Sequence, residues 1–275
     1  MIRSFLLAGL LPVSAFAANP TPDTKITYKK IGAATLQLHV FNPQGHKASD
    51  KRPAVVFFFG GGWVGGSPSQ FYPHCEHLAA KGMVAIAAEY RIKSKHKTGP
   101  QECVKDGKSA VRWIREHAAE LGINPDQLAA GGGSAGGHVA AATAHSKGFE
   151  EDGQNLKIRS VPNALILFNP VLDNGPGEWG HAKVKDYWKD FSPANNISKG
   201  APPAIAFLGS NDKLIPVATL ERYQAAMKKA GSRCELHVYD GQGHGFFNES
   251  KEGGVYYKKT VAEMDKFLKS LGYLK

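Results

Sequence analysis

Several short runs of the chain have the hydrophobic pattern of β-strands. Residues 26–31 and 35–41 come first, and the second run alternates, so that Leu36, Leu38 and Val40 share one face of a half-buried strand. Later runs are apolar at nearly every position, as expected of strands covered on both faces. These continuous runs cover residues 54–59, 83–88, 164–168 and 204–208. Two further short strands are predicted at residues 127–130 and 234–239.

Stretches with helical periodicity separate these strands. Apolar residues recur at helical spacing within residues 71–78, 104–121, 218–230 and 260–271. This alternation predicts an α/β fold, with a mostly parallel central sheet of about eight strands flanked by helices. Ligands in such sheets bind beyond the carboxyl ends of the strands, so functional residues should follow strands. The longest irregular stretch, residues 173–203, is expected to form a minimal lid or wall over the site.

The first residues have the composition of a secretory signal. Arg3 precedes an apolar stretch over residues 5–16, and the small-x-small pattern Ala15-Phe16-Ala17 follows. A buried first helix or a membrane anchor is the alternative, but the stretch is short for a bilayer and Pro12 interrupts it. We therefore expect a signal peptide over residues 1–17, a single domain over residues 18–275, and a secreted or periplasmic protein without a membrane span.

Charge and cysteine content narrow the possible partners. The chain has 34 Lys and Arg against 24 Asp and Glu, a formal net charge of +10. This charge favours anionic substrates or surfaces. The lysines are scattered, however, so nucleic acid binding is not expected. Cys75, Cys103 and Cys234 allow at most one disulfide, and the sequence does not choose the pair or an oligomeric state. His74 and His77 have the position of helix surface residues rather than ligands, so no metal or other cofactor is expected.

A glycine-rich pentapeptide carries the strongest sign of chemistry. Residues 132–136 read GGSAG and match G-x-S-x-G, between a short predicted strand and an alanine-rich helix. A serine on such a tight turn is held in a strained conformation, and larger flanking side chains would collide with the neighbouring strand and helix. The helix N-terminus behind it favours developing negative charge. Ser134 is therefore the candidate nucleophile, although a turn that only packs a helix closely would also use glycines.

A nucleophilic serine needs a base and an acid that orients the base. Asp212 follows the strand at residues 204–208, and His244 follows the strand at residues 234–239 on a glycine-flanked loop. Their order after Ser134 is the usual one for this architecture of catalytic site. Asp173, one strand earlier, is the alternative acid. The other histidines lack a glycine-flanked position after a strand, and they are His138, His145, His181 and His237.

The stretch FFFGGGWVGGS, residues 57–67, ends a buried strand in bare backbone. A phosphate-binding loop would require a Lys-Ser or Lys-Thr pair or a G-x-G-x-x-G turn with a later acid, and neither is present. Acyl transfer instead requires N–H donors aimed at the oxygen that gains charge. We therefore expect an oxyanion hole formed by the backbone N–H groups of Gly61 and Gly62, together with that of Ala135 after the serine.

With these motifs assembled, the chain resembles the hormone-sensitive-lipase-like bacterial esterases of the α/β-hydrolase fold. It is most similar to their short relatives of the acetylxylan and feruloyl esterase type. The family usually has His where this chain has Phe59, so any brace that the His supplies must come from elsewhere. The residue before the serine is Gly133 instead of the frequent Asp. The matching segments are Gly60-Gly61-Gly62-Trp63, Glu89-Tyr90-Arg91, residues 132–137, residues 209–212 and Gly243-His244-Gly245.

The resemblance implies a serine carboxylesterase for short-chain or aryl acyl esters, with a small-molecule or polysaccharide ester as substrate, and the signal-like first residues add the expectation that it is secreted. A lipase or general short-chain esterase, an amidase or peptidase, and an inactive binding homologue remain the alternatives. Aromatic side chains near the expected site either stack on sugars and aryl acids or simply fill the lid. These aromatic residues are Trp63, Trp179 and Trp188, with Tyr187 beside the last.

Overall fold

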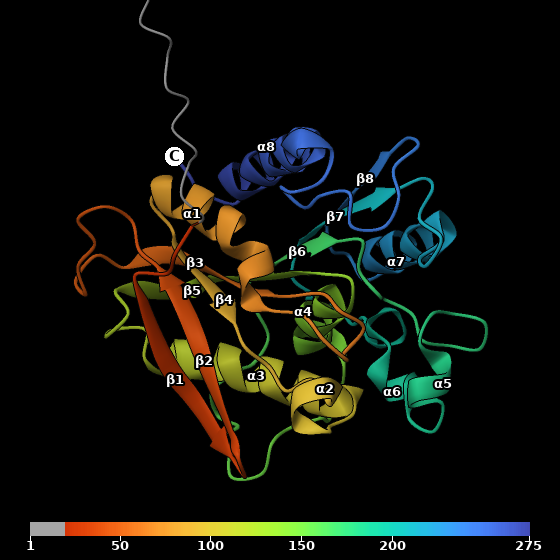
Figure 1. Ribbon diagram of the computed structural model, residues 1–275, viewed down its shortest axis with the longest axis horizontal. Helices are drawn as coiled ribbons and strands as arrows, with labels where there is room; N and C mark the ends of the chain where they lie inside the picture. Colours follow the sequence, from red (N-terminus) through yellow and green to blue (C-terminus); the bar gives the residue numbers. More distant parts are fainter. Residues whose placement is uncertain (1–19) are drawn as a thin grey trace, which may run out of the picture.

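The computed structural model describes residues 20–275, and the signal peptide expected over residues 1–17 lies outside them. A single eight-stranded sheet, in the order β1-β2-β4-β3-β5-β6-β7-β8, runs through the molecule (Figure 1). The first two strands are antiparallel to their neighbours, and all the others are parallel. The predicted fold class is therefore confirmed. The strands are β1 Thr24–Ile31, β2 Ala34–Phe41, β3 Arg52–Phe58, β4 Val84–Ala88, β5 Ile123–Gly133, β6 Ala164–Phe168, β7 Ala204–Gly209 and β8 Cys234–Tyr239.

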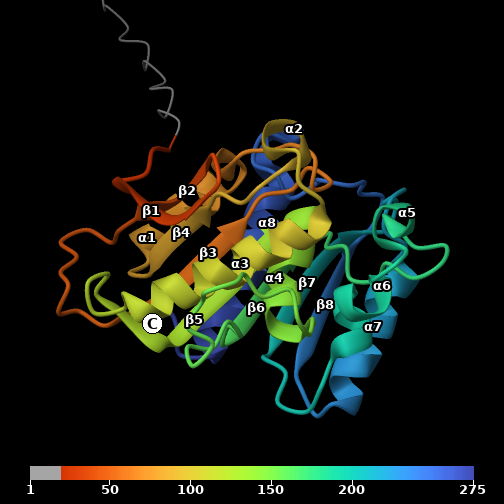
Figure 2. The same cartoon turned by 90° about the horizontal axis from the view of Figure 1, so that it is seen from below.

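Helices cover both faces of the sheet (Figures 1 and 2). α1 and α8 lie on one face, and α3, α4 and α7 lie on the other. The remaining helices are short and lie in loops at the site. The helices are α1 Tyr72–Ala80, α2 Lys93–His96, α3 Pro100–Glu116, α4 Ala135–His145, α5 His181–Val184, α6 Trp188–Phe191, α7 Val217–Lys229 and α8 Val255–Ser270, with 3-10 turns η1 Pro68–Phe71, η2 Pro193–Asn196 and η3 Glu252–Gly254.

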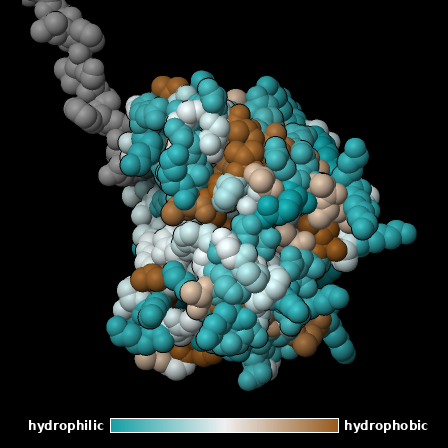
Figure 3. All heavy atoms as spheres, turned by 90° about the vertical axis from the view of Figure 1, so that its right-hand side faces the viewer, coloured by the Kyte–Doolittle hydropathy of each residue, from teal (hydrophilic) through white to brown (hydrophobic). Residues whose placement is uncertain are grey.

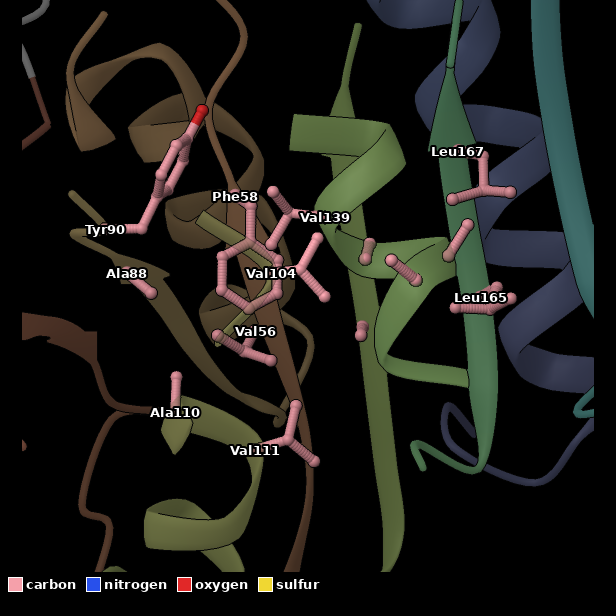
Figure 4. Packing of buried hydrophobic residues seen from close by; sticks show 14 of the residues in the cluster. Val56, Phe58, Ala88, Tyr90, Val104, Ala110, Val111, Val139, Leu165 and Leu167 are labelled. Carbon is pink, nitrogen blue, oxygen red and sulfur yellow. The ribbon is translucent and has the colours of Figure 1, made fainter. Parts of the chain in front are cut away.

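Strand β3 shows why the central runs of sequence are apolar throughout. Its side chains alternate between the two faces, with Val56 and Phe58 in one buried cluster and Val55 and Phe57 in the other. Figure 4 shows Val56 and Phe58 close to apolar side chains of the helices on their face. Because both faces are covered, every position of the strand must be apolar. Burial on both sides thus holds the strand whose end carries the glycine loop.

Two elements are longer than the sequence pattern predicts. β5 continues from residue 130 through its glycines, because Gly131 and Gly132 pair with Phe57 and Phe58 of β3. Glycine disfavours strands in isolation, and here the neighbouring strand overrides that preference. The sequence pattern predicts that the last helix begins at residue 260, whereas α8 begins at Val255. Tyr257 anchors its first turn by donating a hydrogen bond to the Pro73 carbonyl (2.9 Å).

The prediction of a surface position for His74 is wrong. Its side chain is fully buried and lies against several aromatic rings, including those of Phe71 and Tyr257. Burial, with a smaller effect of His77, lowers the pKa of His74 to about 3, so the imidazole is neutral. His77 lies at the helix surface, where its Nε2 is 3.0 Å from a carboxylate oxygen of Asp265. The helical spacing thus predicts the helix correctly, but it does not predict that His74 lies on the buried face of α1.

A buried ion-pair cluster attaches β1 to α3. The Asp106 carboxylate is fully buried and accepts hydrogen bonds from Lys29 Nζ (2.6 Å) and from Arg91 Nε (2.8 Å). Arg91 also donates its backbone N–H to Asp106 (2.9 Å). Glu151 pairs with both Lys29 and Arg91 and balances the second positive charge. The Glu89-Tyr90-Arg91 motif therefore serves the scaffold through its arginine.

We expect Asp106→Asn to destabilise the fold strongly. Removing one partner of a buried pair costs about 3–5 kcal/mol because it leaves buried charge without compensation. Urea unfolding should show a loss in this range. Glu263→Gln, which breaks the exposed pair with Lys266, is the matched control and should cost less than about 1 kcal/mol. Equal, small effects of the two substitutions would contradict a supporting role for the cluster.

Other structural features bear on the remaining expectations. Cys75 and Cys103 are buried, and all three cysteines are free thiols in the part of the chain described. Among residues 20–275, no helix combines the length and apolar character needed to cross a bilayer. Figure 3 shows the side of the molecule that lies on the right in Figure 1. The surface on this side is largely hydrophilic, and its apolar residues form separate groups.

Candidate active site

The backbone places Ser134 in the strained turn that its motif predicts. Its φ of 53° lies in the left-handed region, which non-glycine residues rarely adopt. The Ser134 N–H donates to the Phe168 carbonyl of the neighbouring strand (2.9 Å), which holds the turn against β6. A Cβ at Gly132 or Gly136 would clash with the backbone carbonyl of Phe58 on β3. The glycines around the serine are therefore required by close approach of the strand.

The structure brings Ser134, His244 and Asp212 into one hydrogen-bonded chain. His244 Nε2 lies 2.9 Å from Ser134 Oγ, and His244 Nδ1 lies 2.7 Å from Asp212 Oδ2. An ionised carboxylate can only accept, so the neutral imidazole carries its proton on Nδ1. Nε2 is then free to accept the serine proton. These three residues follow β5, β8 and β7, at the carboxyl ends of the strands where a site was expected.

The environment of Asp212 keeps its carboxylate ionised. Its side chain is fully buried. Burial alone would raise the pKa of Asp212, but hydrogen bonds from His244 and from the backbone N–H groups of Ile215 and Leu214 outweigh burial and lower it. A carboxylate held in this way orients the imidazole and stabilises the imidazolium that forms during catalysis.

The alternative acid and bases are engaged elsewhere. Asp173 accepts the backbone N–H of Gly175 (2.9 Å) and pairs with Arg222, so it ties the loop after β6 to α7. His138 Nε2 lies 3.2 Å from the Phe191 carbonyl, and burial lowers the pKa of His138 to about 3. His145 Nε2 lies 2.9 Å from the Tyr223 hydroxyl. His244 is therefore the histidine that the structure places against the serine.

The glycine loop lies directly beside the serine. A Cβ built on Gly60 would be 3.4 Å from Ser134 Cβ and 3.1 Å from the Gly133 carbonyl oxygen. The following residues, Gly61 and Gly62, have φ values of 130° and 64°, which only glycine adopts easily. Among the hydrogen bonds of the described residues, the N–H groups of Gly61 and Gly62 have no acceptor. Together with the Ala135 N–H at the start of α4, these N–H groups stay the prediction for an oxyanion hole.

Because Phe59 stands where the family usually has a histidine, other groups hold the glycine loop in place. The Phe59 ring stacks on Tyr90 at 4.2 Å between centroids, and the Tyr90 hydroxyl donates to the Phe59 carbonyl (2.6 Å). Gln70 Oε1 accepts the Gly60 N–H at 2.6 Å. The missing histidine is thus replaced by one hydrogen bond on each side of the loop.

Three polar residues that the sequence did not single out connect the parts of this site. Gln70 Nε2 donates to Asn248 Oδ1 (3.0 Å), and Asn248 Nδ2 donates to the Gly245 carbonyl (2.7 Å). Asn169 Oδ1, after β6, accepts the Gly245 N–H (2.9 Å). The glycine loop and the His244 loop therefore share a hydrogen-bonded frame. No sequence motif surrounds these three amide side chains. Only Asn169 has a position that could have suggested a role in advance, because it directly follows β6.

The three tryptophans differ in what they can contact. Trp63 is only 1% exposed and packs against Trp179 and His138, so the suggestion that its ring stacks on substrate is wrong. Its φ of 61° is a conformation that non-glycine residues rarely adopt. Trp179 is half-buried and lies within 3.5 Å of a Cβ built on Gly62. Trp188 is also half-buried and lies against Gly175, within the wall formed by residues 173–203.

Residues 55–248 match the family described as the alpha/beta hydrolase fold, and they contain the glycine loop, Ser134, Asp212 and His244. The chain belongs to this α/β-hydrolase family. The match covers most of the chain, and it confirms at the family level the resemblance seen in the motifs.

Two curated relatives of the chain are esterases. The chain is 28% identical to esterase LipC of Mycobacterium tuberculosis over 227 residues, covering 70% of this chain and 53% of that protein. It is 27% identical to the acetylxylan esterase of Xylanibacter ruminicola over 288 residues, covering 98% of this chain and 55% of the relative. The chain thus spans about half the length of these curated relatives.

A solved structure aligns over nearly its full length. Esterase 2 of Thermogutta terrifontis, phosphorylated by paraoxon, superposes with a TM-score of 0.87 at 45% identity. The alignment covers 91% of this chain and 95% of that chain. The same esterase has been solved with propionate and with butyrate bound. The fold described here is therefore shared with an esterase of similar size.

Proposed function

We propose that the protein is a serine carboxylesterase acting on short-chain or aryl acyl esters, with an acylated carbohydrate as its natural substrate. The observation that carries the proposal is the hydrogen-bonded chain from Asp212 through His244 to Ser134, beside a loop with free backbone N–H groups. This arrangement performs acyl transfer through an acyl-enzyme. The esterase relatives and the acetylxylan esterase support the acyl and carbohydrate parts.

In the proposed mechanism each of these residues has one step. His244 Nε2 takes the Ser134 proton as the serine oxygen attacks the ester carbonyl, while the N–H groups of Gly61, Gly62 and Ala135 stabilise the oxyanion. The imidazolium then gives its proton to the departing alcohol. A water molecule, deprotonated by the same imidazole, then attacks the acyl-enzyme, and the imidazolium returns its proton to Ser134 Oγ as the acid leaves. Asp212 keeps the imidazole oriented throughout.

A panel of aryl esters tests the acyl preference. Acetyl, butyryl, feruloyl and long-chain esters should be compared by kcat/KM, together with acetate release from acetylated polysaccharide. We expect the acetyl and butyryl esters to exceed the long-chain ester, as the short carboxylates bound by the Thermogutta esterase suggest. Paraoxon should inactivate the enzyme stoichiometrically, as expected from the phosphorylated relative. A preference for long chains would instead make the protein a lipase.

We also propose that the protein is exported, on the basis of the signal-like composition of residues 1–17. Expression of the full chain in a bacterial host and sequencing of the N-terminus tests this. A mature N-terminus at Ala18 or Asn19, in the periplasmic or extracellular fraction, is the expected result. An intact Met1 in the cytosolic fraction would overturn it.

A further inference from the structure

A cavity of about 470 Å³ borders the glycine loop after β3. Gly62 and Trp63 form one wall, and Lys93 and Lys97 of the α2 turn form another. Lys183 of α5 closes it from the lid segment. Figures 1 and 2 show α2 and α5 on the same side of the molecule. Gly62 lines the cavity and is also one of the residues proposed for the oxyanion hole, so the cavity adjoins the proposed site.

The residues that line the cavity include three lysines and no acidic side chain. Among the ion pairs of residues 20–275, none includes Lys93, Lys97 or Lys183, and no acidic residue lines the cavity. Lys183 Nζ donates to the Gly62 carbonyl (3.2 Å) and lies 4.9 Å from the centroid of the Trp179 ring. Burial, with a smaller effect of Lys93, lowers the pKa of Lys183. Three lysines on the lining of one cavity favour an anion there.

We propose that this cavity binds the uronic-acid residue of an acylated acidic carbohydrate, with the lysines on its carboxylate. This inference rests on the proposed esterase function and names the alcohol part of the ester substrate. A volume of about 470 Å³ lies in the usual range of ligand sites, roughly 300–1,000 Å³, and greatly exceeds a small inorganic anion. A uronate offers a carboxylate for the lysines on a sugar ring large enough to occupy the cavity. The overall charge of +10 would attract such a polymer.

Hydrolysis of an acylated uronate follows the same two steps as hydrolysis of other esters. The acyl group passes to Ser134 Oγ, and the uronate hydroxyl leaves with the proton carried by His244. Water then releases the acid and restores the serine. The lysines bind the alcohol part alone, so their contribution falls on KM for charged substrates.

The test compares two substrates that differ only in charge. Each positional monoacetate of methyl glucuronoside is paired with the corresponding monoacetate of methyl glucuronamide, and acetate release is measured. We expect kcat/KM for at least one acid to exceed that of its amide by about tenfold, through a lower KM. The ratio should fall towards one as the sodium chloride concentration rises.

Charge variants then locate the effect. Lys93→Gln with Lys97→Gln should bring the acid-to-amide ratio close to one. Lys228→Gln with Lys229→Gln, at exposed lysines of α7, is the matched control and should keep the wild-type ratio. Lys183 is left unchanged because it also holds Gly62. An unchanged ratio in the Lys93/Lys97 variant would overturn the assignment of the cavity.

The outcomes separate the two proposals. Equal kcat/KM values for every acid and amide pair, in an enzyme that hydrolyses them, would overturn the uronate site and leave the esterase function. Failure to hydrolyse any ester, by a folded protein that a fluorophosphonate does not label, would overturn the esterase function itself. The wild-type comparison does not depend on the folding of any variant.

Discussion

Ser134→Ala is expected to lower kcat for a short aryl ester by about 10⁶-fold. Removing a catalytic serine has this effect elsewhere because the base then has no nucleophile to activate. The structure gives the reason here, since Ser134 Oγ is the group 2.9 Å from His244 Nε2. The measurement is a burst and steady-state assay with nitrophenyl acetate, with active sites counted by fluorophosphonate labelling.

Ser198→Ala is the control for this experiment. Ser198 is exposed in the loop before β7, and its hydroxyl has no hydrogen bond within the described residues. The variant should be labelled by the fluorophosphonate and should turn over ester at the wild-type rate. Activity of the Ser134 variant within tenfold of wild type would remove the serine from the mechanism.

Asp212→Asn is expected to lower kcat by about 10⁴-fold while the protein stays folded. An amide at this position favours the wrong imidazole tautomer, so Nε2 no longer accepts the serine proton. The Asp212 carboxylate also receives two backbone N–H groups, and its loss disturbs the turn after β7. A pH–rate profile and circular dichroism together separate the chemical effect from unfolding.

Asp173→Asn distinguishes the two carboxylates considered in the sequence. Asp173 accepts from Gly175 and pairs with Arg222, so its substitution should change kcat by less than about tenfold. A larger loss in the Asp173 variant than in the Asp212 variant would reverse the assignment of the orienting acid.

Much of the fold could be predicted because burial leaves a direct trace in the sequence. The runs at residues 54–58 and 164–168 lie between helices on both faces and are apolar throughout. The glycines of β5 were harder to interpret. Local preference ends the strand before them, whereas pairing with β3 continues it. His74 shows the same limit, since its burial depends on the aromatic rings that surround it.

The residues proposed for catalysis were also accessible to sequence reasoning, since each lies in a glycine-containing turn after a strand. Their contacts with one another could be inferred from the rule that parallel strands end at the same edge. The amide side chains that support the site could not be predicted in this way. Gln70, Asn169 and Asn248 have no local pattern, and they become meaningful only through hydrogen bonds to Gly60 and Gly245.

The sequence by itself determined the class of fold, the order of its elements and the candidate serine, acid and base, because strand burial and glycine turns are encoded locally. Only the tertiary structure decided that Trp63 is buried, how the loop is braced without a histidine, and that Lys93 and Lys183 share a cavity with Gly62. Those properties depend on side chains that are far apart in the chain. Their contacts follow from packing, which no single stretch of sequence specifies.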